Sequence, residues 1–219
     1  MAGENNKALY WMGVGVSVAA VGAALAFGSG HGDEQETRAS SKSPRTVDKV
    51  DLNRYMGTWY EISRYPNPFE GDCAGDTMAH YSLQPDGRIE IVNSCRTRKG
   101  KTKTMRGTAK VVDPTSNAKL KIEYDWPYAG DYWVLILNSF YEYAVVGEPS
   151  RKFLWILSRT PALDKGTYHG VLQQLEELGY DASRLKMTHQ SQRAQHAQNS
   201  EFAELARAGK PKAAAAAAG

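Results

Sequence analysis

The middle of the chain alternates apolar and polar residues with a period of two, which is typical of β-strands. Segments rich in Val, Ile, Tyr and Trp are separated by turn residues such as Pro85-Asp86-Gly87 and Asp113-Pro114. This pattern predicts eight strands, at residues 57–65, 77–83, 88–95, 102–112, 119–124, 131–137, 142–147 and 152–159. Because short connections favour antiparallel neighbours, we expect an all-β domain in which the eight antiparallel strands form an up-and-down meander and close into a barrel.

A helical period follows the last of these strands. Val171, Leu172, Leu175 and Leu178 recur at helical spacing, and the pattern ends at Gly179. The spacing predicts one flanking helix over residues 167–178, packed on the barrel wall, and a short ninth strand at 185–187.

The two ends of the chain differ from the middle. Residues 9–27 form an apolar run, which indicates an export signal or a membrane anchor within residues 1–27. Ala24-Leu25-Ala26 fits signal peptidase, yet the run is also about long enough to span a bilayer, so both alternatives stay open. Residues 28–46 are expected to be a flexible tether, 47–190 the barrel domain, and 191–219 a helical or disordered extension. The protein is therefore expected in the periplasm or attached to a membrane of the cell envelope.

The composition excludes several classes of function. The formal net charge is +3, and basic residues are mixed with acidic ones, so a dedicated nucleic-acid binder is not expected. Cys73 and Cys95 are the only cysteines, which excludes a cysteine-built zinc site and leaves a disulfide, two free thiols or a reactive thiol. The chain has no nucleophile elbow, zinc-protease motif, phosphate-binding loop or dinucleotide fingerprint. We therefore predict no catalytic residue, no metal ligand and no cofactor.

Two motifs about a hundred residues apart carry a family resemblance. Asn53-Arg54-Tyr55-Met56-Gly57-Thr58-Trp59-Tyr60-Glu61-Ile62 resembles the opening signature of the lipocalin family, whose core is Gly-x-Trp. The segment from Arg151 to Pro161 resembles its closing signature. Together with Tyr141-Glu142-Tyr143-Ala144-Val145-Val146-Gly147, the Ile-Leu-Ser-Arg-Thr-Pro ending is most similar to the bacterial outer-membrane lipocalins and their apolipoprotein D relatives. The resemblance implies the lipocalin calyx, a ligand-binding barrel.

Two departures from that subfamily stand out. The bacterial members usually carry a lipid-modified cysteine after the signal, and no cysteine precedes Cys73. The middle signature, usually Thr-Asp and an aromatic residue, is Asn138-Ser139-Phe140 in this chain. We therefore expect no lipoprotein anchor and an altered turn at the closed end.

The resemblance also assigns structural roles. It implies that Trp59 plugs the barrel base beside Gly57 and packs against Arg159 of the last strand. Parity then puts Trp59, Glu61 and Ser63 on one face of the first strand, with Tyr60, Ile62 and Arg64 on the other. The inward carboxylate of Glu61 is either a satisfied buried acid or a polar contact to ligand.

With the strand phases that the resemblance implies, the cavity is expected to be aliphatic and aromatic with few polar points. Such a lining suits acyl chains, although a collapsed core without a cavity is the alternative. The predicted inward residues are Ala79, Tyr81, Ile89, Ile91, Asn93, Leu120, Ile122, Tyr124, Trp133, Leu135 and Leu137. Our predicted ligand-binding set contains all of these except Ile89. It also contains Glu61 and, from the loop after residue 124, Trp126.

In the lipocalin topology, the loop after the third strand lies at the open mouth. Its cations, Arg96, Arg98, Lys99, Lys101, Lys103 and Arg106, form either a solvated hairpin or a surface that attracts anionic headgroups. Trp126 and Tyr128 are candidates for an interfacial aromatic contact beside them. Cys73 and Cys95 also fall near the mouth, where export favours a disulfide between them.

We therefore predict that the protein binds, stores or transports lipids, such as fatty acids or lysophospholipids, in the bacterial cell envelope. A lipocalin-like enzyme that acts on an apolar ligand and an envelope interaction module are the alternatives. The expected partners are an apolar small molecule and, if residues 9–27 are retained, a membrane; a homodimer is left open.

Overall fold

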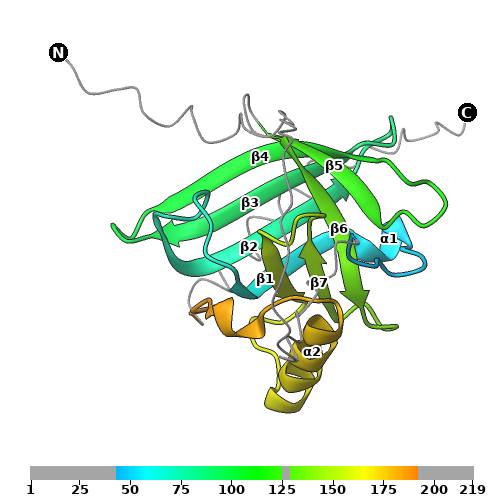
Figure 1. The fold of residues 1–219 in the computed structure, drawn as a ribbon. Helices are drawn as coiled ribbons and strands as arrows, with labels where there is room; N and C mark the ends of the chain where they lie inside the picture. Colours follow the sequence, from blue (N-terminus) through cyan, green and yellow to red (C-terminus); the bar gives the residue numbers. More distant parts are fainter. Residues whose placement is uncertain (1–42, 125–128, 192–219) are drawn as a thin grey trace, which may run out of the picture. The chain divides into compact units, whose positions relative to one another are not determined.

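The computed structural model describes residues 43–124 and 129–191, and its ordered elements form a barrel with one long helix beside it (Figure 1). A short helix, α1 (Leu52–Tyr55), precedes the barrel, and α2 (Lys165–Glu177) with a 3₁₀ turn, η1 (Ala182–Arg184), follows its eighth strand. The strands are β1 (Gly57–Arg64), β2 (Cys73–Leu83), β3 (Ile89–Thr97), β4 (Thr102–Val111), β5 (Lys119–Tyr124), β6 (Ala129–Leu137), β7 (Tyr143–Gly147), β8 (Leu154–Ser158) and β9 (Lys186–Met187).

Strands β1 to β8 form a closed antiparallel barrel. Each strand from β2 to β7 pairs with the next, β8 pairs with β1, and β1 pairs with β2 through residues 57–60 and 78–81. Beyond that stretch β1 pairs with β9 instead, at Ser63 and Arg64. Closure leaves the eight strands without a free edge along most of their length, which removes a route to aggregation. The predicted eight-stranded barrel with one flanking helix is thereby confirmed.

Helix α2 covers one side of the barrel wall (Figure 1). Asp164 caps its first turn by accepting a hydrogen bond from the Thr167 backbone N–H at 2.9 Å. Val171 and Leu175 are buried in a cluster that also contains Ile156 of β8 and Val145 of β7. The outer surface of β6 to β8 is therefore a second core, separate from the barrel interior.

A β-bulge in β6 overturns two of the predicted inward positions. The pairing of β6 with β7 shifts between Val134 and Ile136, which leaves Leu135 as the extra residue. The bulge reverses the alternation on its N-terminal side, so Trp133 and Leu135 lie in the α2 cluster and not in the barrel interior. Tyr132 and Val134 take the interior places instead. Our prediction for Trp133 and Leu135 was wrong because it assumed unbroken alternation back from Leu137.

A second bulge, in β1, changes the surroundings of the polar residues. The register with β8 shifts between Glu61 and Ser63. Glu61 pairs with Leu157 and Arg64 with Trp155, both of which pack in the interior cluster. Glu61 therefore faces inward as predicted, whereas Arg64 also faces inward and Ser63 faces α2, contrary to the simple parity argument.

Four features of the sequence lie outside the described residues: the apolar run at 9–27, residues 28–42 of the predicted tether, Trp126 with Tyr128, and the extension beyond residue 191. Within the described residues, no helix is both long and apolar enough to cross a membrane.

Candidate ligand-binding site

The closed end of the barrel is built around Trp59 and Arg159. The Arg159 guanidinium lies 3.8 Å from the centroid of the Trp59 ring, which is the contact that the resemblance implied. It also donates hydrogen bonds of 2.7–3.3 Å to five backbone carbonyls, those of Arg54, Tyr55, Met56, Thr58 and Tyr141. Gly57, with φ +93°, would place a Cβ 3.4 Å from Arg159 Nη1. One guanidinium thus fixes the end of α1, the start of β1 and the turn before β7.

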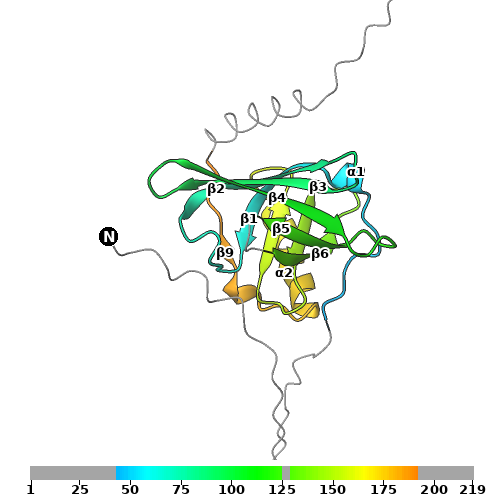
Figure 2. The same cartoon turned by 90° about the horizontal axis from the view of Figure 1, so that it is seen from above.

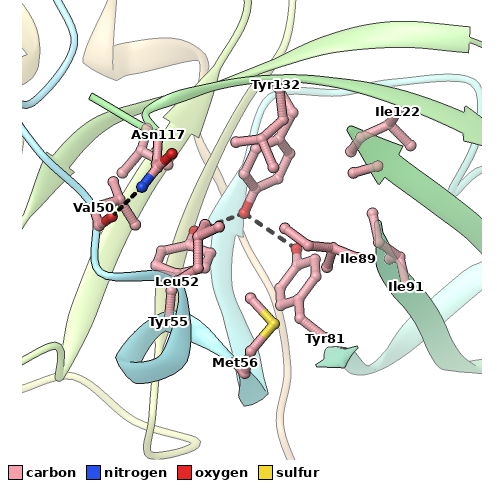
Figure 3. A pocket seen from close by; sticks show the side chains of 13 residues that line it. Val50, Leu52, Tyr55, Met56, Tyr81, Ile89, Ile91, Asn117, Ile122 and Tyr132 are labelled. Atoms are coloured by element: carbon pink, nitrogen blue, oxygen red, sulfur yellow. Dashed lines mark hydrogen bonds between the residues drawn. The ribbon is translucent and has the colours of Figure 1, made fainter. Parts of the chain in front are cut away.

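Inside the barrel, next to this closed end, lies an apolar cavity (Figure 3). The space between its lining side chains has room for hardly more than one water molecule. Its lining comes from the segment before β1 and from the inner faces of β2 to β6: Val50, Leu52, Tyr55, Met56, Tyr81, Ile89, Ile91, Ala109, Asn117, Leu120, Ile122, Tyr132 and Val134. The interior next to the closed end is therefore closely packed, and a ligand larger than a water molecule can bind there only if side chains move.

Three tyrosines supply hydroxyl groups within this apolar lining. The Tyr132 hydroxyl lies 2.7 Å from that of Tyr55 and 3.2 Å from that of Tyr81, and Figure 3 shows it between the two. Burial raises the pKa of each of the three phenols. The hydroxyls therefore stay neutral, and the closed end offers a ligand an apolar surface with uncharged hydrogen-bonding groups.

Between this cavity and the mouth of the barrel, the interior becomes more polar. Asn93 on β3 donates its side-chain amide to the Tyr124 hydroxyl on β5 at 2.9 Å. Burial raises the pKa of Tyr124 to about 12, and the nearby charge of Glu70 acts in the same direction. A Cβ on Gly107 of β4 would lie 2.5 Å from Tyr124 Cδ1, so the absence of a side chain at this position leaves room for the tyrosine ring.

Two carboxyl groups and one guanidinium meet at the mouth side of the interior. Arg64 Nε lies 3.3 Å from Glu61 Oε1 and 2.6 Å from Glu70 Oε2. Glu61 is 3% exposed and accepts a hydrogen bond from the Thr188 hydroxyl, while Trp155 donates its indole N–H to Glu70 at 3.0 Å. Burial, followed by the charge of Glu70, raises the pKa of Glu61 well above that of an ordinary glutamate. Glu61 therefore retains its proton at a higher pH than exposed carboxyl groups do.

The segment after η1 fills the gap between β1 and β2 where these strands do not pair. The Gln190 side chain donates to the carbonyl oxygens of Glu61 at 2.9 Å and Thr77 at 2.7 Å, which bridges the two strands. The Ser191 backbone N–H donates to Asp76 at 2.6 Å. Burial alone would raise the pKa of Asp76, but hydrogen bonds from Ser191 and Arg96 lower it below the usual value. The wall of the upper barrel is thus completed by residues 186–191.

The loop between β1 and β2 folds inward onto Trp155. The Phe69 and Phe153 rings lie 5.3 Å apart, and Phe153 stacks on Trp155 at 6.1 Å. Cys73 and Cys95 form a disulfide with a Cα–Cα distance of 5.7 Å, which joins the end of this loop to β3 and confirms the predicted bond. The mouth is therefore held by a covalent link on one side and an aromatic stack on the other.

Comparisons with known proteins agree with this geometry. The family model described as "Lipocalin-like domain" matches residues 50–190. The chain belongs to the lipocalin family. Its relatives include the temperature-induced lipocalin-1 of Arabidopsis thaliana, 40% identical over 68% of this chain and 84% of that protein. The outer membrane lipoprotein Blc of Vibrio cholerae is 34% identical over 66% and 85%, and apolipoprotein D of Mus musculus is 31% identical over 68% and 82%.

Among solved structures, insecticyanin from the tobacco hornworm Manduca sexta has the same fold, with a TM-score of 0.56 at 24% identity over 70% of this chain and 87% of that one. The lipocalin resemblance of the two signature motifs is thereby confirmed, including the bacterial outer-membrane and apolipoprotein D relatives. Membership of this family supports the binding of a small hydrophobic ligand.

The structure brings most of the predicted ligand-binding residues into the lipocalin interior. Tyr124 and Leu137 pack against the interior cluster, and Asn93 and Glu61 are placed as described above. The cluster itself contains Ala79, Tyr81, Ile89, Ile91, Leu120 and Ile122. Whether these residues contact a ligand stays a prediction.

Sequence reasoning missed the contribution of the segment before β1. Val50, Leu52, Tyr55 and Met56 line the cavity, although the segment contains less than two helical turns and shows no clear period. The available signal was Asp51, which caps α1 through hydrogen bonds to two backbone N–H groups. Among the described residues, no three His, Cys, Asp or Glu side chains gather where they could hold a metal ion.

Proposed function

We propose that this lipocalin binds and transports lipids, fatty acids or lysophospholipids, at the cell envelope. The observation that carries the proposal is a closed barrel with an aliphatic and tyrosine-lined interior below a polar mouth. An acyl chain would lie against residues such as Ile91, Leu120 and Ile122, with its polar head toward Asn93 and Glu61. Affinity would come mainly from apolar burial, at about 25 cal/mol per Å² before ordering costs are subtracted.

The cavity opens, in this proposal, through rotation of side chains near the closed end. Tyr55, Tyr81 and Tyr132 are held to one another by hydroxyl contacts, and Met56 is a flexible side chain beside them. Such groups can reorient without breaking the strand pairing. The ligand would gain apolar burial beside the tyrosine rings, and the three hydroxyls would stay available as hydrogen-bonding groups, as suits a carrier.

We further propose that the carrier domain spans residues 47–190. Residues 1–27 would direct export or anchor the chain in a membrane, residues 28–46 would be the tether, and residues 191–219 would extend beyond the barrel. The outer membrane lipoprotein Blc of Vibrio cholerae among the relatives supports a location in the cell envelope.

The test is a titration of the full chain with a fatty acid that carries bromine atoms, which quench indole fluorescence on contact. We expect saturable quenching, because Trp155 and Trp59 pack on the interior lining. Ala109→Leu fills part of the cavity and should weaken binding roughly tenfold, while the circular dichroism of the strands is retained, as expected for modest overpacking.

Trp133→Leu is the matched control, since Trp133 lies in the cluster outside the barrel. It should leave the dissociation constant unchanged. The carrier proposal is contradicted if Ala109→Leu binds as the unaltered chain does, or if Trp133→Leu weakens binding to the same extent. Mass spectrometry of lipid that copurifies with the chain would then identify the cargo.

A further inference from the structure

The β3–β4 hairpin concentrates positive charge at the mouth. Residues 95–106 contain six cationic side chains and no acidic one. Two of them are paired, Arg96 with Asp76 at 2.7 Å and Arg106 with Glu90 at 3.1 Å. The remaining four, Arg98, Lys99, Lys101 and Lys103, are exposed and form no ion pair within the described part of the chain. The hairpin therefore carries a local excess of positive charge that the overall charge of +3 does not reveal.

Hydrogen bonds and the disulfide fix the backbone that carries these four cations. The Thr97 hydroxyl donates to the Lys101 carbonyl at 2.9 Å, and Gly100 adopts a φ of +74° that closes the turn. The Arg98 backbone N–H donates to the carbonyl of Asp72 at 3.1 Å, and the Cys73–Cys95 disulfide fixes the hairpin base. Asp72 is also exposed beside Arg98, so it offsets part of one charge. The β3–β4 hairpin therefore keeps a net positive charge on a backbone of fixed shape.

The hairpin lies at the end of the barrel away from α1. In both views it extends beyond the neighbouring strands (Figure 1 and Figure 2). The strand β4 runs from this hairpin toward the closed end, so Lys110 lies about 23 Å from Lys103 at about 3.3 Å per residue. That separation exceeds the Debye length of about 8 Å at physiological salt, so the two ends of the barrel present independent electrostatic surfaces.

We propose that the β3–β4 hairpin docks the mouth of the barrel onto an anionic lipid bilayer. Lysine is a compact point charge that suits phosphate groups, and a bilayer presents many such groups in one plane. Residues 95–106 contain no aromatic side chain, whereas proteins that bind single-stranded nucleic acid usually stack bases on aromatic rings. The inference goes beyond the proposed cargo and stands whether or not the barrel carries a lipid.

Lysine reactivity measured residue by residue tests this docking on the full chain. The chain is acetylated in the presence of vesicles of phosphatidylglycerol mixed with phosphatidylcholine, or of phosphatidylcholine alone, and the products are located by mass spectrometry. We expect Lys99, Lys101 and Lys103 to react roughly tenfold more slowly on the anionic vesicles, as attraction to an acidic surface implies. Raising the salt from about 0.1 M to about 1 M should restore their reactivity.

Lys110 and Lys165 are internal controls, because both are exposed and neither belongs to the hairpin: Lys110 lies at the far part of β4, and Lys165 begins α2, six residues after Arg159 of the closed end. Their reactivity should not change. The comparison with phosphatidylcholine separates the hairpin from any membrane binding through residues 9–27, which would occur on both kinds of vesicle. Equal protection on the two vesicles, protection of the controls, or no protection at all would overturn the proposal.

Charge reversal provides a second, independent readout. Lys99→Glu with Lys101→Glu should abolish the salt-sensitive part of binding to the anionic vesicles, whereas Lys110→Glu with Lys165→Glu changes the net charge equally and should not. Equal effects of the two double variants would mean that binding depends on the net charge of the protein and not on the hairpin, which would overturn the proposal. An RNA that protects the same lysines as well as the anionic vesicles do, at equal phosphate concentration, would overturn the choice of a bilayer.

Discussion

The closed end and the mouth of this barrel bury polar groups in different ways. At the closed end, Arg159 is surrounded by backbone carbonyls and neutral phenols. At the mouth, Glu61 and Glu70 share one guanidinium, that of Arg64. At the closed end, a permanent charge is satisfied by dipoles that do not titrate. At the mouth, the charge balance depends on whether Glu61 carries a proton. The stability of the closed end is therefore independent of pH, whereas that of the mouth varies with pH.

Removal of the Arg159 charge should have the largest effect on this comparison. Arg159→Leu leaves five carbonyls without their donor, and we expect a loss of about 3–5 kcal/mol in the free energy of unfolding. Because the carbonyls do not titrate, the loss should be the same from about pH 5 to about pH 8. Equilibrium denaturation with urea measures it.

Arg184→Leu is the matched control. Arg184 lies 4.1 Å above the Tyr65 ring at an exposed position, so its removal should cost less than about 1 kcal/mol. A similar loss for both arginines, or a loss at Arg159 that varies with pH, would contradict the contrast between the two ends.

Removal of the disulfide at the mouth should have the next largest effect on the free energy of unfolding. Serine at both Cys73 and Cys95 releases a link between residues 22 apart in the sequence, and the unfolded chain gains entropy worth about 3 kcal/mol. Thermal unfolding and hydrogen exchange measure the result. Exchange should rise in β2 and in the loop before it, and not around Trp59. Increased exchange throughout the barrel would show that the two ends are not independent.

Glu61→Gln should have no effect at low pH, and the growth of its effect with pH distinguishes it from the other variants. The pKa of Glu61 is raised in the folded protein, so the folded state binds more protons than the unfolded chain above the ordinary glutamate pKa of about 4.3. Stability conferred by protonated Glu61 is therefore full below that value and declines as the pH rises toward the folded pKa.

Glutamine cannot titrate, so the variant should be more stable than the original chain at neutral pH, by about 1.4 kcal/mol for each unit of pKa difference. This advantage should vanish near pH 4, at about the unfolded pKa. Denaturation measured across this pH range, with the exposed Glu90→Gln as control, tests the prediction. An advantage that does not change with pH would contradict the prediction, because it would mean that folding leaves the pKa of Glu61 unchanged.

Alternation and turn residues were sufficient to predict the eight strands, and α2 begins and ends within two residues of its predicted bounds. The candidate site was predicted less well. Ile91, Leu120 and Ile122 were placed correctly in the interior, because no bulge interrupts β3 or β5. Tyr132, at the centre of the tyrosine group, was missed because the bulge at Leu135 reverses the faces of β6.

The sequence by itself determined the strands and the antiparallel meander, since these follow from local alternation and turn residues. The partnership of Trp59 with Arg159 was implied by the lipocalin resemblance of two signature motifs. The tertiary structure alone decided which faces meet after each bulge, how Arg64 and Glu70 reach Glu61, and how residues 186–191 close the wall. The physical reason is that a bulge sets two residues of one strand against one residue of its partner, so its position depends on the pairing of both strands and cannot be found from the alternation within one of them.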